Sequence, residues 1–457
     1  MSHRKDNIYI FMSSIKDIMK GEFRYIINEW LRRELPQTVE REAEIDIKAQ
    51  KIIAIAGVRR AGKTYLLFDI MKRLIKDGTP RKNLLYINFD DDRLQGISPP
   101  DLDEMLNMYI ETADPGKDAP IFIFLDEIQN VMGWELWVRR MHDAQKYRLF
   151  ITGSSSKLLS KEIATALVGR NITYVIYPFS FSEFLLSKGL KPAKEALYTG
   201  DINKINRLAK EYLVRGGFPE VALEGNEDTK QKILSSYYDA ILYRDIVTRY
   251  RVKDANRLDM VFRYAVNTYA SGFSTVKLNN YFKSQNIGIS RQTINNFVKY
   301  GEQTFLFYQL PQFFKSFKRS NQSRKKMYLV DNGIIGLFTS NLEHGRLLEN
   351  EVYIELLRAR ERNPSIEIRY ATSDEGEVDF VISKKGVIVQ AIQVTYELNI
   401  ANRNRELNPL LSIKSKLKPK RCILITFDSV DRRLQIDRGI DVMTFVEWIL
   451  QNRPGLE

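Results

Sequence analysis

Eight consecutive residues near the start of the chain have the types and the spacing that hold a phosphate group. They match the pattern G-x-x-x-x-G-K-[ST], follow an apolar run at Lys51–Ala56 and open an amphipathic helix at Tyr65–Lys76. The eight residues are Gly57, Val58, Arg59, Arg60, Ala61, Gly62, Lys63 and Thr64. In such a loop the glycines turn backbone N–H groups towards phosphate oxygens, the lysine reaches the β and γ phosphates, and the Thr hydroxyl faces Mg²⁺. The segment therefore predicts a site for ATP and Mg²⁺.

A second acidic motif follows about sixty residues later. The apolar run Ile121–Leu125 ends in Asp126 and Glu127, and a buried parallel strand delivers such carboxylates to the sheet edge where the phosphate loop lies. We expect Asp126 to hold Mg²⁺ through water. We expect Glu127 to orient and deprotonate the attacking water, with Lys63 as its catalytic partner on the phosphates.

Three further polar residues are candidates for the same site. Thr152 or Ser154, at the end of the run Arg148–Thr152, could sense the γ-phosphate; the alternative is a serine-rich turn that caps the next helix. Arg170 could stabilise transition-state charge, in its own chain or across a subunit interface. The alternative for Arg170 is a plain surface position before a strand.

The elements that must position these residues alternate as strand and helix. Apolar runs at Asn83–Phe89, Ile121–Leu125, Arg148–Thr152 and Thr173–Tyr177 are separated by segments of helix length, which predicts an α/β fold with a parallel sheet covered on both faces. Glutamate directly after the aspartate, with another strand before it, resembles the AAA-like branch of P-loop NTPases, and we place this domain at residues 51–180. Residues 1–50 are expected to be helical, with Ile26, Ile27, Trp30 and Leu31 on one face.

Three further segments complete the expected organisation. Residues 181–270 form a helical lid or connector. Residues 271–335 have the order helix, turn, helix and hairpin of a winged helix, with Ser274 or Thr275 and then Ser290 as helix caps. Residues 345–457 return to α/β, with strands expected at 366–370, 378–383, 387–395 and 422–426.

Composition excludes several classes of protein. The 457 residues contain one cysteine and three histidines, so an internal disulfide is excluded and a local histidine metal cluster is not expected. The longest apolar runs are far shorter than the ~20 residues that cross a bilayer, and no secretory signal is recognisable, so we expect a cytoplasmic protein without membrane contact. A net charge of +13 favours polyanionic partners.

Several motifs together resemble one family. AGVRRAGKT, FLDEIQN, ITGSSSKLL, VGRNITYVIYPFSFSEFL and Gly216–Glu220 are similar to the AAA-type ATPases of archaea and some bacteria that carry a C-terminal domain of unknown function. The resemblance covers nearly the whole chain. It implies ATP binding, a winged-helix segment and a C-terminal domain similar to restriction-endonuclease-like PD-(D/E)xK nucleases.

The nuclease pattern is incomplete in this sequence. A helix supplies Glu349 or Glu351 and a strand supplies Asp379, but Gln393 and Thr395 stand where a metal-binding glutamate and a lysine would be. We therefore expect no nuclease activity and a domain kept for binding or packing.

Two functions of different classes follow from these observations. The first is an ATPase that couples turnover to DNA binding through the helix Arg291–Gly301 and a basic hairpin loop. That loop contains Lys315, Lys318, Arg319, Arg324, Lys325 and Lys326. The alternative is a signalling switch in which bound nucleotide controls assembly with a protein partner and turnover is slow. A homo-oligomer is compatible with either.

Overall fold

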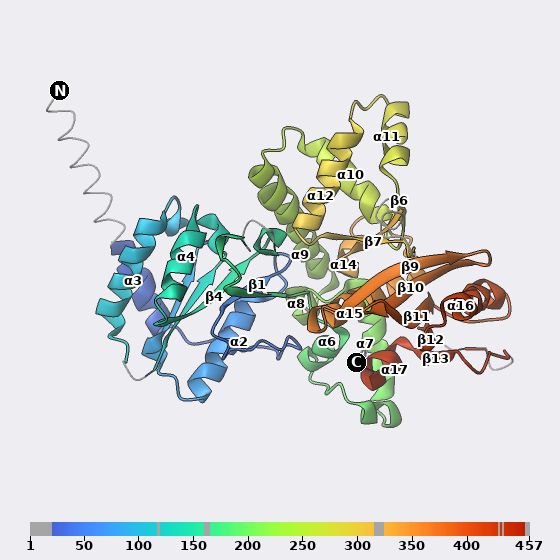
Figure 1. Cartoon of the computed structure of the whole chain (residues 1–457), viewed down its shortest axis with the longest axis horizontal. Helices are drawn as coiled ribbons and strands as arrows, with labels where there is room; N and C mark the ends of the chain where they lie inside the picture. The colour runs from blue at the N-terminus through green and yellow to red at the C-terminus, as the bar shows by residue number, and fades with distance from the viewer. Residues whose placement is uncertain are drawn as a thin grey trace. The chain divides into compact units, whose positions relative to one another are not determined.

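The computed structural model describes residues 21–116, 119–159, 165–314, 324–427, 430–431 and 434–452 (Figure 1). The chain divides into two compact units. Most of the first unit is formed by Ile45–Gly57 and Gly62–Ile176, and most of the second by Tyr177 onwards. Two short pieces of the N-terminal half, Arg41–Glu44 and Val58–Ala61, group with the second unit. The tip of the phosphate loop therefore packs with residues that come late in the chain.

The first unit is built on a parallel sheet of five strands in the order β2-β3-β4-β1-β5. The strands are β1 (Ile52–Ala56), β2 (Leu84–Asn88), β3 (Ile121–Asp126), β4 (Tyr147–Gly153) and β5 (Asn171–Val175). The labelled α-helices are α2 (Lys63–Lys76), α3 (Pro99–Ala113) and α4 (Trp134–Asp143). The chain moves from β1 to β2 in one direction and from β3 to β4 in the other, so right-handed crossovers put α2 and α4 on opposite faces. The predicted parallel α/β sheet is confirmed.

The N-terminal segment agrees only in part with the expectation of a helix over residues 1–50. Residues 21–32 are helical, and their apolar face, which includes Phe23, Ile27 and Trp30, is buried. The Trp30 indole N–H donates to the Leu84 carbonyl oxygen at 2.7 Å. Residues 33–50 contain no helix, so the prediction is wrong there. Pro36 lacks an amide hydrogen and disfavours a helical conformation in the residue before it. Residues 1–20 lie outside the described part of the chain.

The second unit begins with helices and continues into a small antiparallel sheet. The helices are α6 (Phe181–Ser187), α7 (Ile202–Arg215), α8 (Pro219–Leu223), α9 (Glu227–Asp239), a π-helix (Ala240–Thr248), α10 (Ala255–Asn267), α11 (Thr275–Ser284) and α12 (Arg291–Gln303). Three strands, β6 (Ser271–Phe273), β7 (Phe307–Pro311) and β8 (Lys325–Leu329), pair antiparallel in the order β6-β8-β7. The Ser274 and Ser290 hydroxyls accept hydrogen bonds from the backbone N–H groups of Lys277 and Thr293, as predicted for helix caps.

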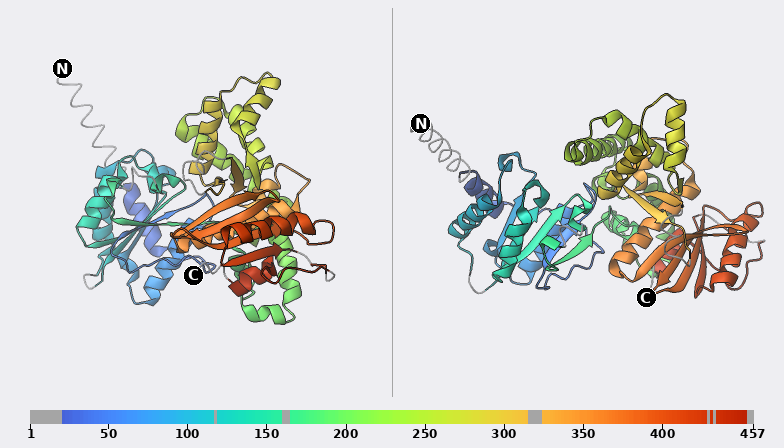
Figure 2. Two further views of the ribbon diagram at one scale, coloured as in Figure 1. Left: turned by 45° about the vertical axis from the view of Figure 1, so that its right-hand side comes forward. Right: turned by 45° about the horizontal axis from the view of Figure 1, so that its top comes forward.

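The C-terminal part of the second unit surrounds a long buried helix. Helix α15 (His344–Arg362) is covered on nearly every side between Leu347 and Ala359, and the short helix α14 (Asn332–Ile335) precedes it. The sheet order is β13-β12-β11-β10-β9, with β9 (Ile366–Ser373), β10 (Gly376–Lys384), β11 (Val387–Thr395), β12 (Arg421–Thr426) and β13 (Asp441–Thr444). Helix α16 (Arg403–Leu417) packs on β10 and β11 (Figure 2), and α17 (Phe445–Asn452) follows β13. The described residues contain no helix that is long and apolar enough to cross a membrane.

Candidate functional site

The loop between β1 and α2 has the backbone that a phosphate cradle requires. Gly57, Arg60 and Gly62 have positive φ angles of 155°, 69° and 95°, so the chain reverses tightly and its N–H groups can converge on one point. A side chain at Gly57 is impossible, because a Cβ atom there would lie 2.1 Å from the Ile176 carbonyl oxygen. The loop ends at the amino terminus of the 14-residue helix α2, whose partial positive charge also favours an anion.

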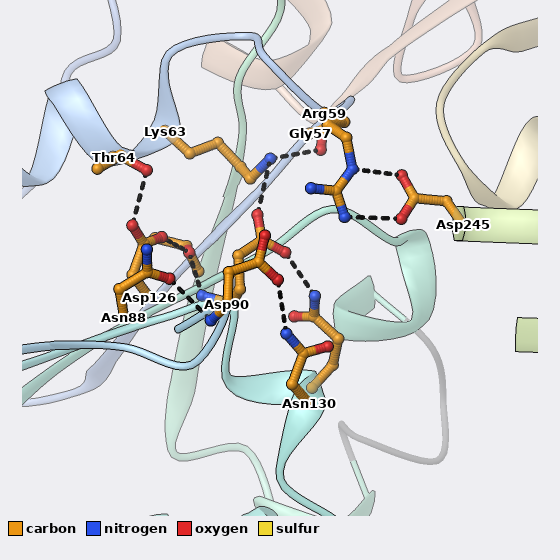
Figure 3. Close-up of polar contacts among 12 residues, drawn as sticks. Gly57, Arg59, Lys63, Thr64, Asn88, Asp90, Asp126, Asn130 and Asp245 are labelled. Carbon is orange, nitrogen blue, oxygen red and sulfur yellow. Dashed lines mark hydrogen bonds and ion pairs between the residues drawn. The ribbon is translucent and has the colours of Figure 1, made fainter. Parts of the chain in front are cut away.

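Lys63 extends back across this loop. Its ammonium group donates to the Gly57 carbonyl oxygen at 3.1 Å (Figure 3). The same ammonium lies 3.5 Å from Glu127 Oε1. Only 4% of the Lys63 side chain is exposed. A buried ammonium in this position can bridge the phosphates of a nucleotide and the carboxylate that follows β3.

Three hydroxyl groups converge on Asp126 at the end of β3. Thr64 donates to Asp126 Oδ2 at 2.6 Å, the Tyr86 hydroxyl donates to the same oxygen at 2.9 Å, and Thr152 donates to Oδ1. Burial, and then the charge of Glu127, raise the pKa of Asp126, while the three hydrogen bonds act in the opposite direction. Thr64 and Asp126 present adjacent hard oxygen atoms, which are the ligands that Mg²⁺ prefers, so the residues present fit this ion.

Glu127 is held in an unusual conformation at the start of a short turn, with φ at 53°. Its backbone N–H donates to the Thr152 hydroxyl at 2.9 Å, and the Gln129 amide donates to its Oε2. Positive φ is uncommon for a glutamate and implies that its neighbours hold the backbone in this conformation, while Gln129 and Lys63 hold the carboxylate. The Glu127 carboxylate faces the Lys63 ammonium, with 3.5 Å between Oε1 and Nζ.

Thr152 and Ser154 both lie at the carboxyl edge of the sheet, at or just after the end of β4. Thr152 bridges Asp126 and the backbone of Glu127, as described above. Ser154 is fully buried, and its hydroxyl has no hydrogen-bond partner among the described residues. The Ser154 hydroxyl therefore does not form the hydrogen bond by which it would cap the next helical turn.

Arg170 lies away from the residues of the phosphate loop and of the acidic pair in its own chain. It immediately precedes β5, whose first residue pairs with Ile52 at the start of β1, so it lies at the amino edge of the sheet. The phosphate loop leaves from the opposite edge. The Arg170 guanidinium forms an ion pair with Asp143 Oδ1 at 2.6 Å. A role in its own active site is therefore not supported.

The tip of the loop, Val58–Ala61, makes contacts that the sequence did not indicate. Arg59 forms a two-pronged ion pair with Asp245 of the π-helix, and Ala61 accepts a hydrogen bond from Arg41 at 2.9 Å. Arg60 lies over the Tyr237 ring, with 5.5 Å between its guanidinium carbon and the ring centroid. Asp245, like Tyr86, lies in no motif that could have assigned it to the site from the sequence.

A second cluster of charged groups lies in the C-terminal part of the second unit. The Lys326 ammonium contacts Glu349 Oε1 at 2.6 Å, Glu377 Oε1 at 2.7 Å and Asp379 Oδ1 at 3.1 Å. Burial and the Glu349 charge raise the pKa of Asp379 to about 8, although Lys326 lowers it. The sequence did not decide between Glu349 and Glu351 as the helix glutamate beside Asp379. In the structure it is Glu349 that shares the Lys326 ammonium with Asp379. The other, Glu351, accepts a hydrogen bond from Tyr212 instead.

Gln393 and Thr395, the two residues that depart from the expected nuclease pattern, have partners of their own. The Gln393 amide donates to Glu406 Oε2 at 3.0 Å, and the Thr395 hydroxyl donates to the Glu397 carbonyl oxygen at 2.9 Å. Within the described residues, no group of three or more His, Cys, Asp or Glu side chains is arranged to hold a metal ion. The ammonium of Lys326 occupies the centre of the carboxylate cluster instead.

Two residues that were expected on the basic hairpin loop do not lie there. Lys325 and Lys326 are the first residues of β8. Lys325 is half-buried, and Lys326 is buried in the cluster just described because three carboxylates hold its ammonium. Arg324 is exposed and donates to the Gly272 carbonyl oxygen at 2.8 Å. The predicted contributors Lys315, Lys318 and Arg319 lie outside the described residues.

Comparisons with known proteins match this organisation. The chain matches an AAA domain at residues 49–185 and two domains of unknown function, DUF8612 at 206–343 and DUF4143 at 344–448. An uncharacterized protein of Methanocaldococcus jannaschii is 36% identical over 420 residues, which cover 91% of each chain. An uncharacterized protein of Haemophilus influenzae is 34% identical over 404 residues, which cover 88% of this chain and 94% of that protein.

Solved structures are much less similar. The ORC1 protein of Aeropyrum pernix in complex with DNA is 12% identical to this chain and has a TM-score of 0.27. The match covers 75% of this chain and 94% of the ORC1 chain. AMPPCP-bound DnaA of Aquifex aeolicus is 14% identical to this chain and has a TM-score of 0.21. The match covers 61% of this chain and 86% of the DnaA chain. Scores this low do not establish a shared overall fold.

Proposed function

This chain belongs to a family of AAA-domain proteins whose C-terminal half consists of two domains of unknown function, and from that premise we propose that it binds and hydrolyses ATP. One observation carries the proposal. Four polar residues meet at the carboxyl edge of the parallel sheet: Lys63, Thr64, Asp126 and Glu127. The Thr64 hydroxyl lies 2.6 Å from Asp126 Oδ2, and the Lys63 ammonium lies 3.5 Å from Glu127 Oε1.

Each residue has a distinct role in this proposal. Lys63 and the loop N–H groups bind the β and γ phosphates, and Thr64 and Asp126 hold Mg²⁺, which when bound neutralises phosphate charge. Glu127 orients the attacking water and takes its proton, in a geometry fixed by Gln129. In this proposal the buried hydroxyl of Ser154 donates to a γ-phosphate oxygen, and Thr152 holds Asp126 and Glu127 through hydrogen bonds to both.

The test separates binding from turnover. Lys63→Ala should abolish tight ATP binding, whereas Glu127→Gln should retain ATP and lose about 100-fold or more in turnover, because only the proton acceptor is removed. Matched controls are Lys76→Ala, at the far end of α2, and Glu111→Gln, on the exposed side of α3. Equal loss of ATP binding in both active-site variants would falsify the role given to Glu127.

We further propose that the segment from β6 to β8 is a winged helix that binds DNA. The order β6, α11, α12, β7, β8 and the antiparallel pairing of the strands support it. The outward face of α12 supports it as well, because Arg291, Gln292, Asn295 and Lys299 are exposed there. These residue types are the ones that contact phosphates and base edges.

The salt dependence of DNA binding tests this second proposal. The slope of log K against log[salt] is about −0.9 per phosphate contact, so Arg291→Ala with Lys299→Ala should flatten it by up to about two units. Lys204→Ala with Arg207→Ala, which removes the same charge from the exposed side of α7, should leave it unchanged. If the protein binds no DNA at low salt with or without ATP, the nucleotide-controlled switch for a protein partner becomes the leading function.

The C-terminal part is proposed to be a nuclease-like domain that does not cleave DNA. The ammonium of Lys326 among Glu349, Glu377 and Asp379 supports this, since a fixed cation there competes with any metal ion. For Arg170, the remaining proposal is that it acts across the interface of a homo-oligomer, where its partly exposed side chain would leave Asp143 and reach a neighbouring nucleotide.

A further inference from the structure

The tip of the phosphate loop is attached to the helical segment by one strong ion pair. Arg59 Nε lies 3.0 Å from Asp245 Oδ2, and Arg59 Nη2 lies 2.9 Å from Asp245 Oδ1 (Figure 3). The Asp245 side chain is 2% exposed and the Arg59 side chain is 13% exposed. Two parallel N–H···O bonds between planar groups form the strongest common type of protein ion pair. An arginine in a phosphate loop is thus held by a buried carboxylate.

A second arginine competes for the same carboxylate. Arg249 lies one turn further along the chain, and its Nη2 is 3.8 Å from Asp245 Oδ1. Its Nη1 is buried and has no hydrogen-bond partner among the described residues. A buried guanidinium nitrogen without a partner is costly, so Arg249 gains if it can approach Asp245 more closely. Asp245 therefore has two alternative partners.

The helix around Asp245 is suited to such an exchange. Residues Ala240–Thr248 form a π-helix, a rare conformation that is common at functional sites. Breaking a buried ion pair is strongly unfavourable when it leaves one charge unpaired. Transfer of Asp245 from Arg59 to Arg249 avoids this, because the carboxylate keeps a cationic partner throughout.

Arg59 belongs to the segment that surrounds the phosphates. It lies four residues before Lys63, at the tip of the loop whose backbone has positive φ at Arg60 and Gly62. A nucleoside triphosphate brings one more phosphate group than a diphosphate, at the end of the chain that Lys63 and Glu127 face. Arginine binds phosphate in the same two-pronged manner as carboxylate, so the third phosphate is a direct competitor of Asp245.

We propose that Arg59 is a phosphate-binding residue specific for the third phosphate of the nucleotide, and that Asp245 competes for it and passes to Arg249 when the triphosphate binds. This inference rests on the proposed nucleotide binding at the same loop. It makes Arg59, together with Lys63 and Ser154, a residue that distinguishes ATP from ADP.

The test compares the affinities of the non-hydrolysable analogue AMP-PNP and of ADP by calorimetry in the presence of Mg²⁺. Arg59→Ala should weaken the binding of AMP-PNP by about tenfold to a hundredfold, as expected for loss of one charge-assisted contact. It should change the affinity for ADP by less than about threefold. Asp245→Asn removes the competitor, so it should tighten AMP-PNP by up to about tenfold and leave ADP unchanged. Arg249→Met removes the alternative partner and should weaken AMP-PNP.

The control variant is Asp259→Asn on α10. It removes the ion pair in which Asp259 Oδ2 lies 2.6 Å from Arg263 Nε, and it should change the affinity for neither AMP-PNP nor ADP. Unchanged ADP affinity in each variant shows that the loop is folded. If Arg59→Ala weakens both nucleotides alike, or neither, the inference is overturned while nucleotide binding stands. Tightening of ADP as well by Asp245→Asn would also overturn it. If the wild-type protein binds neither nucleotide, the proposed function itself fails.

Discussion

Removal of Lys326 should destabilise the second unit strongly and in a pH-dependent way. Its ammonium is shared by Glu349, Glu377 and Asp379 at 2.6, 2.7 and 3.1 Å, and only 5% of the lysine side chain is exposed. Glu377 is 43% exposed and can regain water, but the other two carboxylates cannot. Loss of one partner from a buried ion pair costs about 3–5 kcal/mol, so Lys326→Met should lose this much stability near pH 8.

The pH dependence follows from the pKa of Asp379, which burial raises to about 8 even with the lysine present. A carboxyl group with a raised pKa binds its proton more tightly in the folded state, so its contribution to stability falls as pH rises through that value. Without Lys326 the pKa rises further. At pH 5.5 the carboxyl group is protonated, and the variant should lose only about 1–3 kcal/mol, from hydrogen bonds.

The assay is urea unfolding followed by circular dichroism at pH 5.5 and pH 8, with a separate transition fitted for each unit. Lys325→Met is the matched control, because this neighbouring lysine is only half-buried, and its loss should change stability by less than about 0.5 kcal/mol. Lys326→Met combined with Glu349→Gln should lose less than the sum of the single variants. A loss that is the same at both pH values would refute the reasoning.

Three further predictions concern other buried groups. Tyr86→Phe removes one hydrogen bond from Asp126, so the Mg²⁺ concentration for half-maximal ATP turnover should rise about threefold to tenfold; an unchanged Mg²⁺ titration contradicts this. Burial raises the pKa of Glu351 and of Asp331 to about 7, so the second unit should lose on the order of 2 kcal/mol between pH 5 and pH 8, and Glu351→Gln should flatten the profile of urea midpoints. Incubation of plasmid DNA with Mg²⁺ or Mn²⁺ should give no nicks, and nicks that disappear in Asp379→Ala would show an active site.

The strands and the phosphate site could be predicted because their signals are local. A buried parallel strand must be apolar over its whole length, and the expected segments Lys51–Ala56 and Ile121–Leu125 lie within one residue of the observed β1 and β3. The phosphate loop is likewise a contiguous pattern in which each residue type has a physical reason. Two short strands were missed: β6 and β13 have only three and four residues, too few for a recognisable alternation.

The sequence by itself determined the parallel α/β sheet, the loop at Gly57–Thr64 and the acidic pair after β3, because these depend on neighbours along the chain. Only the tertiary structure decided which side chains from distant segments meet. Arg59 and Asp245 are 186 positions apart, and Lys326 and Asp379 are 53 apart. A single arginine, aspartate or lysine has no periodicity to distinguish a buried ion pair from a solvated surface. Folding alone brings the opposite charges together, and burial then makes each of them depend on its partner.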